Sequence, residues 1–147
     1  MGSDDEDVIP SSFFDDDGKS LGTSLEEMPR PLPGGVVLDQ DYGVSARAMN
    51  AIIFRPGSAF LQELLQIQKT TNYVAEPWKK VGNEPIRRVV TYTQAATKLV
   101  KAVKASETQT YIRADDKCFC VRTVCATPDV PCGGNFVIEM QVWLIIL

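Results

Sequence analysis

Hydrophobic periodicity predicts two short helices in the first half of the chain. Ser45 and Ser58 suit the N-cap positions of helices over Ala46–Phe54 and Ala59–Gln68. Pro56 and Gly57 lie between them and would end the first helix. The apolar residues recur at helical spacing and are expected to face a core: Met49, Ile52, Ile53, Phe60, Leu61, Leu64, Leu65 and Ile67.

After the second helix the pattern changes to strands. Five runs rich in β-branched and aromatic residues are predicted to be strands: Asn72–Trp78 (interrupted at Pro77), Ile86–Thr93, Glu107–Arg113, Cys118–Thr127 and Phe136–Leu147. Residues 81–85, 114–117 and 127–135 carry the Gly, Pro, Asn and Asp of turns. Hairpin-linked strands predict an antiparallel sheet, and helices gathered before them predict the α+β class.

The composition of the chain changes near residue 35. Residues 1–35 are rich in Asp, Ser, Gly and Pro, so we expect a disordered acidic tail and a linker. Residues 1–30 hold nine acids and two bases, a net charge of −7, whereas the remaining 117 residues carry +3. Phe13 and Phe14 interrupt the acidic segment, and they fit either an incidental pair or a short docking motif for a partner.

The residue inventory argues against an enzyme or a metalloprotein. Histidine is absent, which removes the commonest general base and zinc ligand. The four cysteines, Cys118, Cys120, Cys125 and Cys132, follow no familiar zinc spacing, so we predict free thiols. Asp115 belongs to a predicted turn, and no glycine-rich phosphate loop is present. We therefore expect no catalysis, no metal and no cofactor.

Other partners are limited by the same inventory. The basic residues are scattered without an aromatic platform, so nucleic-acid binding is not expected. No apolar run reaches the roughly 20 residues of a membrane span, and the acidic start does not fit a signal peptide. We therefore expect a cytosolic protein.

Several ordered motifs resemble one family. Residues 42–80, YGVSARAMNAIIFRPGSAFLQELLQIQKTTNYVAEPWKK, resemble the opening of VASt domains, and RRVVTYTQAATKLVKAVKASETQTY and TPDVPCGGNF continue the resemblance. VASt domains are START-like lipid-binding modules of the Lam and Aster sterol transporters and of plant GRAM-domain proteins. The segment PRPLPGGVVLDQDY resembles the plant branch most. The resemblance covers residues 36–147, which we expect to form one domain.

This resemblance implies a fold and a function. The family's helix-grip fold is a curved antiparallel sheet around a long C-terminal helix, and the two enclose a cavity for a sterol-sized lipid. Because the chain ends at VWLIIL, residues 142–147, we expect the domain to lack that helix and to bind lipid poorly by itself. The implied function is non-enzymatic binding and transfer of a sterol or phospholipid at the cytosolic surface of membranes, in a parent protein anchored at contact sites.

The family also implies a mobile loop over the cavity mouth, here Gln94–Lys104. Its apolar residues would cover the ligand or enter the bilayer, and its lysines would meet anionic head groups: Leu99, Val100, Val103, Lys98, Lys101 and Lys104. From the residues alone, a surface helix packed on the sheet is an alternative. Because the family's loop glycine and proline are absent, we expect this loop to be more helical.

Strand parity suggests residues that line the cavity, although each also suits an ordinary core: Trp78, Val90, Tyr92, Phe119, Val121, Phe136 and Ile138. A second hypothesis is an interaction scaffold without a working cavity. That scaffold would bind a protein partner through the acidic tail and the open edge at residues 142–147.

Overall fold

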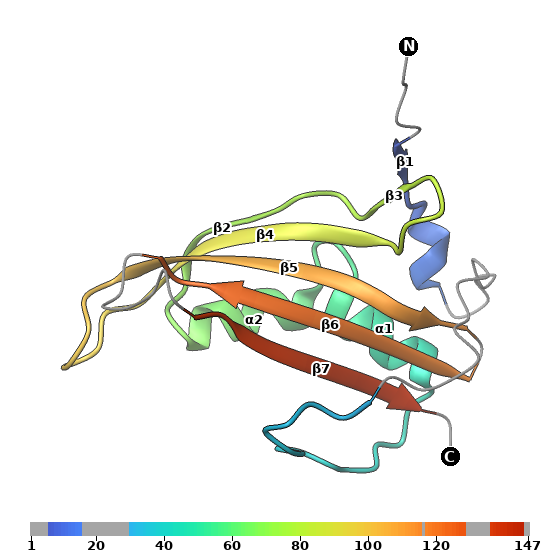
Figure 1. The fold of residues 1–147 in the computed structure, drawn as a ribbon, viewed down its shortest axis with the longest axis horizontal. Helices are drawn as coiled ribbons and strands as arrows, with labels where there is room; N and C mark the ends of the chain where they lie inside the picture. Colours follow the sequence, from blue (N-terminus) through green and yellow to red (C-terminus); the bar gives the residue numbers. More distant parts are fainter. Residues whose placement is uncertain (1–5, 16–29, 116, 129–135, 146–147) are drawn as a thin grey trace.

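The computed structural model describes residues 6–15, 30–115, 117–128 and 136–145. Within these residues it contains two α-helices, α1 (Ala46–Phe54) and α2 (Ala59–Ile67), and a short 3-10 helix, η1 (Ser11–Phe14). The strands are β1 (Glu6–Val8), β2 (Thr71–Ala75), β3 (Lys79–Val81), β4 (Arg87–Gln94), β5 (Val103–Ala114), β6 (Cys118–Ala126) and β7 (Ile138–Ile145). Figure 1 shows the curved sheet with α1 and α2 on one side of it. The predicted α+β arrangement of two helices and an antiparallel sheet is confirmed.

The sheet is antiparallel throughout the described residues. Its order is β1-β3-β4-β5-β6-β7, and β2 pairs with β4 beside β3. The first predicted strand, Asn72–Trp78, corresponds to β2, which ends at Ala75 before Pro77, a residue without an amide hydrogen for the ladder. Two strands outside the five predicted ones, β1 and β3, bring the sheet to seven strands within the described residues.

The helix boundaries follow the predicted caps. The Ser45 hydroxyl accepts a hydrogen bond from the Ala48 amide at 3.0 Å, and the Ser58 hydroxyl accepts one from the Leu61 amide at 3.3 Å. Gly57 has a φ of 71°, a left-handed conformation that glycine adopts without strain. This turn places α1 and α2 on the same side of the sheet (Figure 1).

The core lies between α1 and the sheet and is centred on Tyr111. This residue is fully buried, and its hydroxyl donates to Asn50 Oδ1 of α1 at 2.6 Å. Its ring centroid lies 4.8 Å from that of Trp78 and 6.1 Å from that of Phe54. The Trp78 indole in turn donates to the Phe54 carbonyl at 3.0 Å. These contacts fix α1 to the sheet at one end of the strands.

The expectation of a disordered tail is wrong for residues 6–15. β1 pairs with β3, and Phe13 and Phe14 are each only 2% exposed within the core. The Phe13 ring centroid lies 5.2 Å from that of Tyr111, in an edge-to-face arrangement. Burial of two phenylalanine side chains stabilises this segment enough to order it against the domain. The rest of the expected acidic tail, residues 1–5 and 16–29, lies outside the described residues.

Two acidic residues of the same segment form ion pairs within the domain. Glu6 lies 3.4 Å from Lys79, and Asp15 lies 3.3 Å from Arg55. Phe13 and Phe14 lie between these two ion pairs in the sequence and are buried in the protein's own core. Their burial corrects the docking-motif interpretation.

The predicted turn at residues 114–117 joins β5 to β6. The Asp115 carboxylate accepts hydrogen bonds from the amides of Lys117 and Cys118 at 2.8 and 2.9 Å. It also accepts one from Arg113 Nε at 2.6 Å. Burial would raise the pKa of Asp115, but these hydrogen bonds outweigh it and hold that pKa below its usual value.

Replacement of Phe13 by alanine is expected to lower the free energy of unfolding by about 3–5 kcal/mol, because it leaves a cavity beside Tyr111. Urea unfolding measures this loss. Phe60→Ala on α2 is the matched control, because Phe60 is 48% exposed and should lose much less. A loss below about 1 kcal/mol for Phe13→Ala would show that the segment does not belong to the core.

Asp115→Ala is expected to lower the free energy of unfolding at pH 7 by about 1–3 kcal/mol, because three donors lose a charged acceptor. A lowered folded-state pKa means that this stabilisation is present above the unfolded pKa, about 3.9, and is lost as pH falls through the folded value. Urea unfolding between pH 7 and 2.5 should show the difference from the wild type shrinking. A constant difference across that range would contradict this prediction.

Candidate functional site

The face of the sheet beneath the helices, here called the helix face, is defined by the strand register. Arg88 pairs with Gln109, Gln109 with Thr123, and Thr123 with Met140, so these side chains form one row across four strands. A parallel row, further from α1, contains Val90, Glu107, Cys125 and Ile138. Tyr111, Val121 and Val142 form the row at the α1 end. The helix face therefore changes from an aromatic core to a mixed polar and apolar surface along the strands.

A hydrogen-bonded network crosses this face. Arg88 Nε donates to Gln109 Oε1 at 2.8 Å, and Gln109 Nε2 donates to Glu107 Oε2 at 3.2 Å. The Tyr92 hydroxyl donates to the other oxygen of Glu107 at 2.9 Å. Burial, followed by the nearby charge of Glu107, raises the pKa of Tyr92, so this phenol stays protonated. The network is a fixed polar patch inside an apolar sheet.

On the helix face of β7, the side chains become more exposed from Val142 toward Ile138, where the strand begins. Val142 is partly buried and packs against the core, whereas Met140 and Ile138 are 51% and 52% exposed. Among the described residues, nothing covers these two side chains fully. The helix face therefore opens at the end opposite the aromatic core.

The predicted cavity-lining residues fall into two groups. Trp78, Val90, Phe119 and Val121 are at most 2% exposed. Of these, Trp78, Phe119 and Val121 belong to the core cluster around Tyr111. The others lie toward the open end: Tyr92 is partly buried, and Phe136 and Ile138 are 46% and 52% exposed.

The network was not predicted from the sequence. Arg88, Glu107 and Gln109 lie at inward positions, and strand parity was used to select apolar residues only. The signal available was β5 itself, whose sequence VKASETQTYIRA carries polar residues at both parities. A central strand with polar residues on both faces indicates that polar side chains interact with one another on the covered face of the sheet.

The loop that joins β4 to β5 comprises residues 95–102 and projects from the end of the sheet (Figure 1). Its predicted helical character is wrong, because no helix is present in this segment. The Thr97 hydroxyl accepts hydrogen bonds from the amides of Leu99 and Val100 at 3.3 and 3.1 Å. This side-chain turn competes with helix formation. The alternative of a surface helix packed on the sheet is excluded by the same observation.

The expected loop residues separate into a tip and a base. Leu99 is 95% exposed and Val100 is 44% exposed, and Lys98 and Lys101 flank them in the exposed loop. The base belongs to β5, in which Val103 is 9% exposed and pairs with Gln94, and exposed Lys104 pairs with Thr93. Strand pairing therefore shortens the expected mobile segment at both ends.

None of the cysteines within the described residues forms a disulfide. Cys118, Cys120 and Cys125 are buried, and no group of metal-ligating side chains is found among the described residues. Cys132 lies outside them. Burial raises the pKa of Cys120 to about 12, so its thiol stays protonated and unreactive.

The described part of the chain contains no helix that is long and apolar enough to cross a bilayer.

These features define a START-like α+β domain, in which α1, the N-terminal segment and a curved antiparallel sheet enclose an aromatic core and leave one end of the sheet open. Residues 36–145 match the family described as VAD1 Analog of StAR-related lipid transfer (VASt) domains. The chain belongs to this family, and the predicted resemblance is confirmed.

Relatives include plant and animal proteins. A C2 and GRAM domain-containing protein of Arabidopsis thaliana is 41% identical over 138 residues, 92% of this chain and 14% of that protein. The Aster-B proteins of mouse and human are 26% and 25% identical over 136 residues, 90% of this chain and 18% of each protein. The chain thus spans less than a fifth of the length of these relatives.

Alkylation provides a test of the buried thiols. With iodoacetamide at pH 8, peptides that contain Cys120 should stay unmodified in the folded protein and become modified in urea, because burial keeps the thiol protonated. Peptide mass spectrometry measures both states. Rapid modification of Cys120 without urea would contradict the structure of β6.

Proposed function

We propose that this chain binds one lipid of sterol type and moves it to and from membrane surfaces without covalent chemistry. Membership of the VASt family supports a lipid-transfer module. The names of the relatives describe proteins much longer than this chain. We therefore infer the type of lipid and the site of membrane contact from the surface residues of this domain.

The ligand would lie on the helix face, at its open end. Half-exposed Met140 and Ile138 offer apolar surface there, and burial of such surface stabilises a ligand by roughly 25 cal/mol per Å². The Tyr92–Glu107–Gln109 network offers fixed polar groups beside them. A sterol has a rigid apolar body and one hydroxyl, which suits a surface of this kind.

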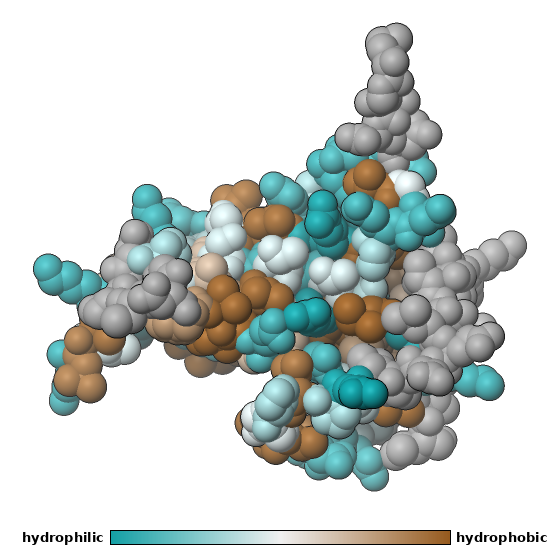
Figure 2. Space-filling view, viewed as in Figure 1, coloured by the Kyte–Doolittle hydropathy of each residue, from teal (hydrophilic) through white to brown (hydrophobic). Residues whose placement is uncertain are grey.

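The membrane contact would be the tip of the β4–β5 loop. Figure 2 shows hydrophobic surface at the end of this projecting loop, beside hydrophilic surface. Leu99 and Val100 can enter the apolar part of the bilayer while Lys98 and Lys101 remain at the head groups. Each lysine contributes about 1 kcal/mol near an anionic surface.

This exposed tip is the observation that carries the proposal. A leucine that is 95% exposed and flanked by lysines has no structural role within the described residues. The scaffold hypothesis is less well supported, because Glu6 and Asp15 of the acidic segment form ion pairs within the domain.

The loop can be tested with vesicles that contain sterol and anionic lipid. Leu99→Asp is expected to lower vesicle binding at least about tenfold, because the side chain can no longer enter the bilayer. Sterol extraction, measured after sedimentation of the vesicles, should fall in parallel. Leu38→Asp is the matched control, because Leu38 is 68% exposed on a segment far from the loop (Figure 1).

The lysines can be tested in the same assay. Lys98→Gln combined with Lys101→Gln should weaken binding to anionic vesicles about tenfold or more and leave binding to neutral vesicles unchanged. Equal effects of Leu99→Asp and Leu38→Asp would contradict the proposed loop contact. Absence of sterol extraction by folded wild-type protein would contradict the proposed ligand.

A further inference from the structure

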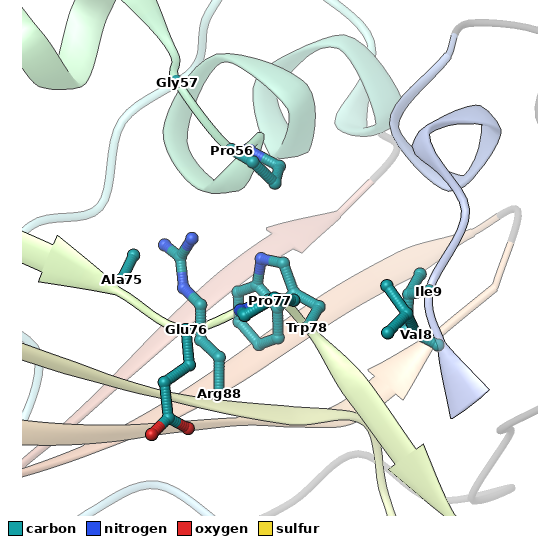
Figure 3. Close-up of a pocket in the computed structure, with 9 residues that line it drawn as sticks. All are labelled: Val8, Ile9, Pro56, Gly57, Ala75, Glu76, Pro77, Trp78 and Arg88. Atoms are coloured by element: carbon teal, nitrogen blue, oxygen red, sulfur yellow. The ribbon is translucent and has the colours of Figure 1, made fainter. Parts of the chain in front are cut away.

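A pocket lies away from the open end of the helix face. It has a volume of about 260 Å³ and is lined by residues 8–9, 56–57, 75–78 and Arg88. Figure 3 shows the turn between α1 and α2 on one side of it and the segment after β2 on the other. The N-terminal segment closes a third side. Three parts of the chain that are distant in sequence therefore build this pocket.

Arg88 is the charged group of the pocket. The residue is only 3% exposed, its Nε donates to Gln109, and its guanidinium carbon lies 4.4 Å from the centroid of the Trp78 ring. Its two terminal amino groups have no hydrogen-bond partner among the described residues. In Figure 3 they point across the pocket toward Pro56.

Among the residues that the structure describes, no carboxylate forms an ion pair with this guanidinium. Glu76 lines the pocket, but its carboxylate points away from the Arg88 amino groups (Figure 3). Glu107 reaches Arg88 only through the side chain of Gln109. Burial lowers the pKa of Arg88, and its interactions with Tyr73, Tyr111 and Glu107 oppose that effect. Because neither amino nitrogen of Arg88 is a fully buried atom without a partner, the pocket leaves both accessible to a ligand.

We propose that this pocket binds an oxyanion, the phosphate or carboxylate group of a small molecule or of a lipid head group, through the two free amino groups of Arg88. A planar guanidinium with two free amino groups matches two oxygens of such an anion. Trp78 holds the guanidinium through a cation–π contact, and the hydrogen bond to Gln109 fixes its direction. Gly57 precedes the N-cap of α2, so the positive end of that helix dipole lies at the rim.

The test uses the indole N–H signals of the two tryptophans in a nuclear magnetic resonance titration. Trp78 lines the pocket, whereas the Trp143 indole donates to Gln141 on the opposite face of the sheet, so Trp143 is an internal reference. Inorganic phosphate and acetate are titrated at constant ionic strength, with chloride as the control anion. Phosphate or acetate should move the Trp78 signal saturably and leave the Trp143 signal in place.

Three variants locate the binding. Arg88→Gln should abolish saturation, and Arg87→Gln, which changes the exposed neighbour on the other face, should leave it unchanged. Ala75→Leu narrows the pocket without touching the network and should weaken binding at least tenfold. If Arg88→Gln fails to fold, Ala75→Leu alone tests whether the anion binds in this pocket.

A third titration, with dihexanoyl phosphatidic acid, distinguishes a lipid head group from a small soluble anion. Tighter binding of this lipid than of phosphate indicates a head group, and weaker binding indicates a small soluble anion. Equal linear shifts of both indoles with every salt, or unchanged binding in Ala75→Leu, would overturn the proposal. Sterol extraction should be unaffected by Ala75→Leu, so failure of this site is distinguishable from failure of the proposed lipid transfer.

Discussion

The structure depends on the burial of Tyr111 at the centre of the sheet. Its ring contacts the rings of the N-terminal segment, of α1 and of the β2–β3 connection, and its hydroxyl donates to Asn50. Burial raises the pKa of this phenol, so it remains a neutral donor at any physiological pH. One residue of β5 thus holds together elements that are separated by up to a hundred residues.

This anchoring has a consequence for function. Because α1 and the N-terminal segment are fixed at the Tyr111 end, the other end of the helix face stays accessible at Met140 and Ile138. The same end carries the projecting β4–β5 loop (Figure 1). A rigid aromatic core at one end and an open, partly polar surface at the other suit a domain that accepts and releases a ligand. The Arg88 pocket lies between these regions, because Arg88 contacts both Trp78 and the network.

Much of the fold could be predicted from local signals. The caps at Ser45 and Ser58 and the turn at Asp115 are decided by hydrogen bonds between near neighbours, and sequence patterns record such bonds well. The burial of Phe13 could not be predicted in this way, because its partners lie about a hundred residues away and its flanking acids suggest disorder. In the β4–β5 loop, the composition favours a helix, but hydrogen bonds to the Thr97 hydroxyl stabilise a turn instead.

The candidate site was predictable only in part. Parity correctly placed Val90 and Tyr92 on one face, but it could not separate core from open surface, since that depends on which residues the helices cover. The polar network was missed because inward positions were assumed to be apolar. The guanidinium of Arg88 contacts Trp78 and Gln109 there, and neither contact can be read from the sequence RRVV.

Sterol binding on the helix face is tested most directly with a fluorescent sterol, the wild type and two variants of adjacent residues. Met140→Arg puts a charge on the helix face, and Gln141→Arg puts the same charge on the opposite face. We expect saturable binding of one sterol to the wild type, at least tenfold weaker binding to Met140→Arg and unchanged binding to Gln141→Arg. Equal binding by all three folded proteins, or none by the wild type, would contradict this expectation.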